Sequence, residues 1–307
     1  MNENIENPAP LRDFRAGFVS IIGMPNVGKS TLMNVLVGEK MSIITSKAQT
    51  TRHRIMGILN GKHEGIPFQL VYSDTPGVVK PAYKLHDSMM TFVKGSLEDA
   101  DVVLFVTEVG EKAAGHEVLP LLQRTQAPII LVLNKIDLSN EEELKRKTEE
   151  WETAIQPAAI IPISALLNAN VQTLFDAIIT RLPFHPPYFD EDELTDKPER
   201  FFASEIVREK IFLNYRQEIP YSSEVVISEF KERDDMIVIR AEILVERKSQ
   251  KGIIIGEKGI MLKKIGTQAR EDMEAFFGKK VFLEQHVKVE PDWRSKENKL
   301  RQFGYEE

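Results

Sequence analysis

Residues 23–30 read GMPNVGKS, and this stretch decides the fold of the first half of the chain. It fits the pattern Gly-x-x-x-x-Gly-Lys-Ser/Thr, in which two glycines let the backbone curl so that successive N–H groups point at phosphate oxygens. An apolar run at residues 17–22 precedes it, and a helical pattern at residues 29–36 follows. A helix N-terminus placed behind such a loop adds a favourable dipole for an anion. The stretch therefore predicts a phosphate-binding loop between a strand and a helix.

Strand-like and helix-like runs alternate outward from this loop. The predicted strands are residues 17–22, 68–72, 102–107, 129–133 and 160–163, and the predicted helices are residues 29–36, 85–97, 118–126, 141–154 and 171–182. Alternation of this kind predicts an α/β fold with a mostly parallel sheet covered on both faces. We expect this P-loop domain to occupy residues 16–182, after a disordered N-terminal tail at residues 1–15.

The order of elements changes after a proline-dense, acidic stretch, which predicts a linker at residues 183–199. A helix at 200–216 precedes strands at 223–232 and 236–246, a glycine-punctuated basic helix, a strand at 280–289 and a terminal helical stretch. This pattern predicts a smaller α+β domain at residues 200–307.

Composition and charge limit the class of protein. The 307 residues include no cysteine, which excludes disulfides and cysteine-bound zinc. No apolar run approaches the roughly 18 residues needed to cross a bilayer, so we expect a soluble, cytoplasmic protein. We also expect it to be a monomer. The net charge is −7, but six basic residues and one acid lie between residues 247 and 264. Because local charge decides where a polyanion docks, this segment is a candidate nucleic-acid surface.

The phosphate loop supplies the first group of candidate site residues. Lys29 is expected to reach the β- and γ-phosphates, and the Ser30 hydroxyl is expected to bind Mg²⁺. The residues predicted to contact the nucleotide here are Gly23, Pro25, Asn26, Val27, Gly28, Lys29, Ser30 and Thr31.

The base is predicted by residues 134–137, which read NKID directly after a predicted strand. The Asp137 carboxylate can accept from both the N1–H and the exocyclic amine of guanine, a pair that adenine lacks. Asn134 is expected to face the other edge of the ring, and the stem of Lys135 is expected to lie across it. Ser164 and Ala165 follow a later strand, with the Ala165 amide placed for the guanine O6. Together these residues predict GTP as the nucleotide.

Two further polar stretches predict the metal site and the switch. Asp74 opens the sequence DTPG and is expected to hold Mg²⁺, while the Gly77 amide is expected to sense the γ-phosphate. A hydroxyl from residues 46–52 would complete the metal shell only while the γ-phosphate is present. Thr51 is our choice for that ligand, and Thr50 is the alternative. We assign catalysis to Lys29, Thr51, Asp74 and Gly77.

These motifs, and the QTTR loop at residues 49–52, resemble those of the Era family of GTPases. Residues 253–265 read IIIGEKGIMLKKI and resemble a KH-domain signature, in which a Gly-x-x-Gly loop lets the backbone approach a nucleic-acid backbone. The residues expected to contact RNA are Ile255, Gly256, Glu257, Lys258, Gly259, Lys263 and Lys264.

The resemblance implies more than the residues do. Era-like proteins are GTPases of small-ribosomal-subunit assembly whose KH domain binds the 3′ end of 16S rRNA. The resemblance implies the same role for this chain. Two alternatives stay open: a GTPase acting on another RNA, and a nucleotide-regulated RNA chaperone without significant turnover. The resemblance also leaves open a weak peripheral association of the terminal helix with the inner membrane.

Two features depart from general GTPase chemistry. Val78 follows Gly77 where many GTPases have a water-orienting Gln, so slow basal hydrolysis is expected. His86 and Gln49 are conceivable substitutes, although structural or surface roles are favoured for both. Asn26 is similar to an Asn that helps related GTPases bind K⁺, which predicts K⁺-stimulated turnover. Trp151 and Trp293 are expected to be packing residues.

Overall fold

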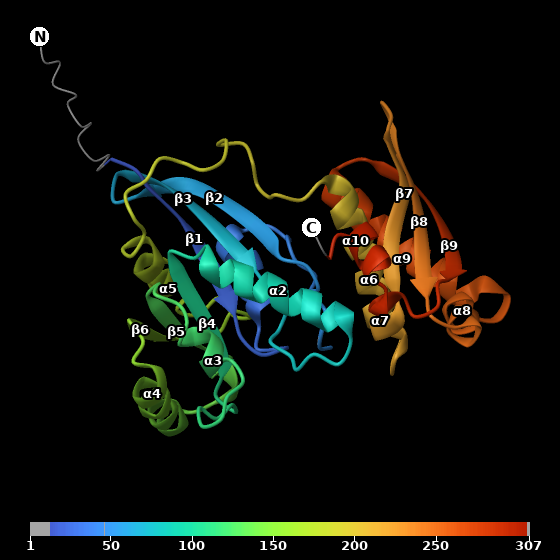
Figure 1. Ribbon diagram of the computed structural model, residues 1–307. Coiled ribbons are helices and arrows are strands. Elements are labelled where there is room, and N and C mark those ends of the chain that lie inside the picture. The colour runs from blue at the N-terminus through green and yellow to red at the C-terminus, as the bar shows by residue number, and fades with distance from the viewer. Residues whose placement is uncertain (1–12, 46, 306–307) are drawn as a thin grey trace, which may run out of the picture.

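The computed structural model describes residues 13–45 and 47–305, which form two lobes joined along a seam (Figure 1). The expected tail at residues 1–15 lies mostly outside the described residues. Its last residue, Arg15, already belongs to the first strand, β1 (Arg15–Ile22). The first strand therefore begins one residue before the predicted start of the domain at residue 16.

The first lobe contains a six-stranded sheet in the order β2-β3-β1-β4-β5-β6. Its further strands are β2 (Ile55–His63), β3 (Ile66–Asp74), β4 (Val102–Glu108), β5 (Ile129–Asn134) and β6 (Ala159–Pro162). All neighbouring strands are parallel except the β2–β3 hairpin. The predicted mostly parallel sheet is confirmed. β2 is not among the predicted strands, because Gly57, Asn60 and Gly61 are residue types that are depleted in strands.

Helices cover both faces of this sheet. The helices α1 (Lys29–Val37) and α5 (Val171–Ile179) pack on one face through side chains such as Leu32 and Leu174. The other face carries α2 (Lys84–Glu98), α3 (Leu119–Leu122) and α4 (Glu141–Ile155), with Val93 and Trp151 in its core. α3 is one turn, shorter than the helix expected at residues 118–126, because the chain soon turns back to enter β5.

The second lobe is the smaller α+β domain that the sequence predicts. It comprises α6 (Glu199–Asn214), α7 (Ile219–Ser222), β7 (Glu224–Glu232), β8 (Met236–Val245), α8 (Lys248–Ile255), α9 (Ile260–Phe277) and β9 (Lys280–Val289). The strand order is β7-β8-β9, with β7 antiparallel and β9 parallel to β8. The basic helix is two helices, since the segment between Ile255 and Ile260 turns sharply. The chain ends with the short helix α10 (Glu297–Gln302).

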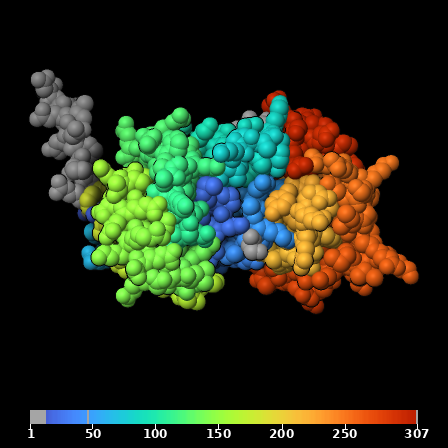
Figure 2. Space-filling view, turned by 90° about the horizontal axis from the view of Figure 1, so that it is seen from below, coloured from blue at the N-terminus to red at the C-terminus, as the bar shows by residue number. Residues whose placement is uncertain are grey.

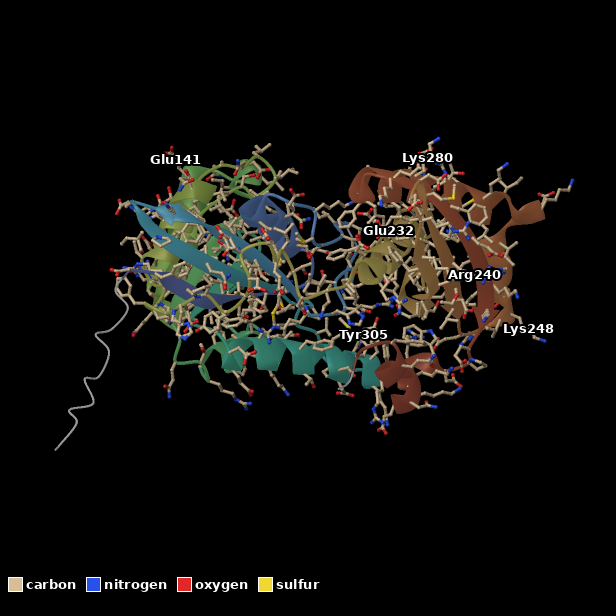
Figure 3. All side chains as sticks on the ribbon, turned by 90° about the horizontal axis from the view of Figure 1, so that it is seen from above. Glu141, Glu232, Arg240, Lys248, Lys280 and Tyr305 are labelled. Atoms are coloured by element: carbon tan, nitrogen blue, oxygen red, sulfur yellow. The ribbon has the colours of Figure 1, made fainter. Side chains whose placement is uncertain are left out.

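The two lobes share buried surface. The connecting segment lies along the edge strand β2, where the Ile58 amide donates to the Leu194 carbonyl at 2.9 Å. On the other side of the seam, Trp293, Leu300 and Tyr305 pack against Leu85 and Met89 of α2. Figure 3 shows Tyr305 between the lobes, near the end of α2. Among the described residues no helix is long and apolar enough to cross a membrane.

Candidate active site

A cavity of about 370 Å³ lies beyond the carboxyl ends of the parallel strands. Such an edge is where open α/β sheets bind ligands. The loops of the predicted nucleotide-binding motifs meet there, although together they span more than a hundred residues of sequence. The predicted site residues that line it are Pro25, Asn26, Gly28, Lys29, Ser30, Thr31, Thr51, Gly77, Asn134, Lys135, Asp137, Ser164 and Ala165.

Three predicted residues lie beside the cavity instead of lining it. The Gly23 carbonyl accepts from the Val78 amide at 3.0 Å, and Val27 is buried in the core of α1 and the sheet. Asp74 is fully buried beneath the hydroxyl of Ser30. All three therefore shape the floor of the site.

Gly28 shows why the phosphate loop needs a glycine at its end. Its φ is +99°, which favours glycine, and an added Cβ would lie 2.2 Å from Asn134 Nδ2. The loop thus packs directly against the strand end that carries the predicted base-recognition residues. A side chain at this position would separate the two halves of the site.

Lys29 is buried beneath the phosphate loop. Its Nζ donates to the carbonyls of Gly23 at 3.2 Å and Met24 at 2.8 Å. Burial lowers the pKa of Lys29 to about 8, while the nearby Asp74 and Glu111 carboxylates act to raise it. A bound phosphate would add further negative charge and favour the protonated amine.

Three oxygen-bearing side chains converge at the start of α1. Asp74 Oδ2 accepts from Ser30 Oγ at 2.7 Å and from Thr51 Oγ1 at 3.4 Å, and the two hydroxyls are 2.9 Å apart. Asp74 Oδ1 is buried without a partner among the described residues, and burial raises the pKa of this carboxyl. Thr50 points elsewhere, since its hydroxyl bonds to Thr45 Oγ1 and the Lys47 carbonyl. This set of hard oxygen donors with an unpaired carboxylate oxygen fits Mg²⁺, and its geometry favours Thr51 over Thr50.

Asn134 has a role that sequence analysis missed. Its Nδ2 donates to the Val27 carbonyl at 2.8 Å, and its Oδ1 accepts from the Ala165 amide at 3.0 Å. The side chain is buried, so it ties the phosphate loop to the loop after β6. The Ala165 amide, expected to reach guanine O6, thus bonds to Asn134 here, and its contact with the base stays a prediction.

Two other residues of the NKID segment, Lys135 and Asp137, line the cavity. Lys135 adopts a left-handed backbone conformation (φ 64°), and its ammonium group pairs with Glu108 at the end of β4. That ion pair holds the side chain beside the space where a base would stack. Asp137 is exposed at the cavity wall, which leaves its carboxylate accessible to a ligand.

The loop after β3 brings Gly77 against the phosphate loop. An added Cβ there would lie 2.7 Å from the Pro25 backbone nitrogen, so only glycine allows this approach. The Val78 side chain is buried in the core, consistent with its expected inability to orient water. His86 is buried outside the cavity, and its Nδ1 accepts from the Ala82 amide, which supports a structural role. Gln49 does line the cavity.

The predicted RNA-contact residues lie on one outer surface of the second lobe. The loop between α8 and α9 carries Gly256, Lys258 and Gly259 at positive φ values of 71°, 50° and 77°. The side chains of Lys258, Lys263 and Lys264 are exposed, and no ion pair involves them within the described part of the chain. Ile255 is half-buried and Glu257 is exposed at the same turn. Lys248, on neighbouring α8, lies on the side of this lobe away from the first (Figure 3).

A groove of about 390 Å³ runs beside this loop, between α9 and β9. Leu262 and Leu283 supply its apolar lining, and Gly266 lets Gln285 lie close to the helix. The Nε2 atom of Gln285 is buried without a hydrogen-bond partner among the described residues. A groove lined by both apolar and basic side chains, with an unpaired amide next to a basic loop, suits an unstacked base.

Trp151 and Trp293 are both fully buried, which confirms that they are packing residues. Trp293 Nε1 donates to the Ser222 carbonyl at 3.0 Å within the second lobe.

Fold and site together define a P-loop GTPase followed by a KH-type domain, and the comparisons with known proteins agree. Residues 18–135 match the family described as 50S ribosome-binding GTPase, and residues 218–294 match the KH domain family. The GTPase Era proteins of Geotalea uraniireducens and Geotalea daltonii are each 46% identical to this chain over 299 residues, covering 96% of it and 99% of the relative. The chain therefore belongs to the Era family of GTPases.

Two solved structures extend the likeness across both lobes. A crystal structure of Era in complex with MgGDPNP and nucleotides 1506–1542 of 16S ribosomal RNA has a TM-score of 0.90 and 42% identity, covering 95% of this chain and 99% of that one. A crystal structure of an Aquifex aeolicus Era variant bound to GDP and aluminium fluoride has a TM-score of 0.89 and the same identity and coverage. The arrangement of the two lobes here is thus similar to that of nucleotide-bound relatives.

Proposed function

We propose that the cavity binds GTP, with the phosphates on the loop of residues 23–31 and the base between Asn134, Lys135 and Asp137. The observation that carries this proposal is the meeting of all the motif loops at one cavity. Lys29 and the loop amides would stabilise charge on the phosphates, so catalysis rests on positioning and electrostatics. Val78 supplies no water-orienting group, so basal turnover is slow.

We further propose that Ser30, Thr51 and Asp74 hold Mg²⁺ in the GTP state. When bound, the ion neutralises charge on the β- and γ-phosphate oxygens. Asn26 lies in the same cavity wall at a positive φ of 66°, where its side chain is a candidate ligand for K⁺. Potassium would supplement the positive charge at the phosphates, and K⁺-stimulated turnover is the expected consequence.

The KH-type lobe is proposed to bind the 3′ end of 16S rRNA and to make the protein a GTP-dependent factor in assembly of the small ribosomal subunit. Its support is the exposed lysine surface, the groove with the unpaired Gln285 amide, and the 42% identity to a relative solved with that RNA. Residues 255–259, Lys263 and Lys264 would contact the RNA. A partner of this kind places the protein in the cytoplasm, and we propose that it acts there as a monomer.

Peripheral membrane association has no support from the terminal helix. Leu300 is buried against α2, so its main apolar residue is already used in the seam.

Crosslinking the protein to RNA in cells and sequencing the footprint tests the RNA assignment. A footprint on the 3′ end of the small-subunit rRNA, lost in a Lys258→Glu variant, is expected. A footprint spread over messenger or transfer RNA would favour a GTPase acting on another RNA. RNA binding with no measurable GTP turnover, with or without RNA, would favour the chaperone alternative.

A further inference from the structure

We propose that Arg52 is a positioning residue through which the KH-type lobe holds Thr51 at the metal site. The inference rests on the proposed role of Thr51 as a Mg²⁺ ligand. It adds that the GTPase lobe does not place this ligand alone, because the residues on both sides of Thr51 are anchored in the other lobe.

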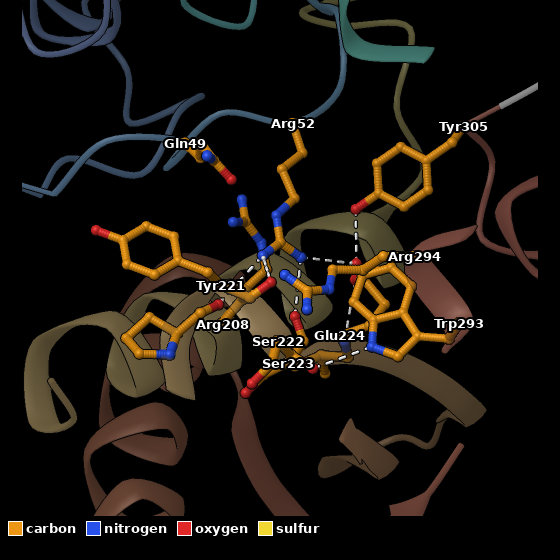
Figure 4. A network of polar contacts seen from close by, with 12 residues as sticks. Gln49, Arg52, Arg208, Tyr221, Ser222, Ser223, Glu224, Trp293, Arg294 and Tyr305 are labelled. Carbon is orange, nitrogen blue, oxygen red and sulfur yellow. Dashed lines mark hydrogen bonds and ion pairs between the residues drawn. The ribbon is translucent and has the colours of Figure 1, made fainter. Parts of the chain in front are cut away.

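The Arg52 side chain crosses the seam and is fully buried in the second lobe. Its Nη1 donates to the Ser223 carbonyl at 2.8 Å, and its Nη2 donates to the carbonyls of Pro220 and Tyr221, both at 3.1 Å. Figure 4 shows the guanidinium directed at this turn. These carbonyls belong to the end of the four-residue helix α7 and the residue after it, where helix carbonyls lack intrahelical partners. Arg52 therefore caps a helix of the other lobe.

An acidic partner completes the buried site. Arg52 Nη1 lies 3.0 Å from Glu224 Oε2, and Tyr305 donates its hydroxyl to the same oxygen at 2.6 Å. The Glu224 Oε1 atom accepts from the Val225 amide at 3.0 Å. A buried guanidinium with this many partners has one favourable geometry, because removing any of them leaves a buried charge less satisfied. While Arg52 stays docked, these contacts restrain the loop that carries Thr51.

The residue before Thr51 is anchored in the same way. Arg208 of α6, fully buried and paired with Glu205, donates to the Thr50 carbonyl. Thr50 and Arg52 thus both bond to the second lobe, one through its backbone and the other through its side chain. In Figure 2 the blue part of the first lobe lies next to the yellow-to-orange part of the second lobe, and Lys40 pairs with Glu209 of α6 at 3.1 Å.

Within its own lobe, Thr51 has weaker support. Its hydroxyl contacts Ser30 and Asp74 at 2.9 and 3.4 Å, and these are the groups that would share the metal. The position of Thr51 therefore depends on the docking of the KH-type lobe. If docking of the KH-type lobe raises the affinity for a nucleotide that needs Thr51 in place, then by linkage that nucleotide favours the docked arrangement by the same factor.

The test compares the full-length Arg52→Ala variant with Arg54→Ala, a matched control. Arg54 lies two residues further on, but its guanidinium bonds to Ser73 and Asp99 of its own lobe. We expect Arg52→Ala to reduce the preference for a non-hydrolysable GTP analogue with Mg²⁺ over GDP on the order of 10-fold, while GDP affinity is retained. Arg54→Ala is expected to keep the parental preference.

Hydrogen exchange supplies a readout independent of turnover. With the GTP analogue bound, residues 47–53 should exchange faster in Arg52→Ala, while β1 remains as protected as in the parent. Arg52→Lys keeps the charge but reaches fewer carbonyls, so it should give an intermediate preference. If Arg52→Ala does not fold, Arg52→Lys carries the test by itself.

An unchanged analogue-to-GDP preference and unchanged exchange in folded Arg52 variants would overturn the proposal. Failure of the proposed function would look different, because the parent protein would then show no Mg²⁺-dependent preference for the GTP analogue.

Discussion

Replacing Asn134 with Ala tests whether one side chain aligns the loops of the nucleotide site. The change removes the bonds to the Val27 carbonyl and the Ala165 amide, both buried. Leaving a buried polar group unpaired costs about 1–3 kcal/mol. Because two such groups lose their partner, we expect the variant to lose about 2–6 kcal/mol of free energy in total. If about 2 kcal/mol of this loss comes from misaligned loops in the nucleotide site, GDP affinity should drop about 30-fold.

Isothermal titration with GDP, together with urea unfolding of the free protein, measures both effects. Asn140→Ala is the control, since this residue caps α4 by accepting from the Glu143 amide at 3.0 Å, away from the cavity. That change should cost about 1 kcal/mol of stability with no change in GDP affinity. If Asn134→Ala bound GDP within threefold of the parent, the alignment role would be refuted.

Thr51→Ala should raise the Mg²⁺ concentration needed for half-maximal GTP hydrolysis at least tenfold, whereas Thr50→Ala should change it far less. Equal shifts in the two titrations would contradict the assignment of Thr51. Turnover should be several-fold faster in KCl than in NaCl, and Asn26→Ala should lose that difference; equal rates of the parent in both salts would exclude a potassium site. Burial, together with the nearby Arg294 and Arg52, lowers the pKa of His86. As pH falls below about 6.5, this side chain therefore binds a proton in the unfolded chain but not in the folded one. This group should therefore lower the free energy of unfolding by up to about 1.4 kcal/mol per pH unit. Urea unfolding at pH 7 and 5.5 should show a smaller decrease in that free energy for His86→Gln than for the parent. Equal decreases in the two proteins would contradict the prediction.

The GTPase lobe was largely predictable because its signals are local. The phosphate loop, the strand ends and the helix starts each follow from a few neighbouring residues, and the carboxyl edge of a parallel sheet brings them together. β2 was not predicted because its glycines and Asn60 weaken the strand pattern. Its pairing with β3 stabilises the strand, and this pairing cannot be read from the local sequence.

The seam between the lobes could not be predicted from the sequence. An arginine in a polar loop such as residues 46–52 is normally solvated, and nothing near Arg52 in the sequence indicates that it is fully buried. Its partners lie about 170 residues further along the chain. Asn134 is similar, because its expected contact with the base concealed its bonds to two distant loops. In both cases tertiary contacts, not local pattern, decide the role.

Guanine recognition by Asp137 is the central assignment for this site, and competitive binding of GTP and ATP measures it directly. A site matched to the purine edge should prefer GTP by roughly 10⁴-fold, and Asp137→Asn should remove most of that preference with little change in ATP affinity. Equal binding of GTP and ATP by the parent protein, or an unchanged preference in Asp137→Asn, would contradict the assignment.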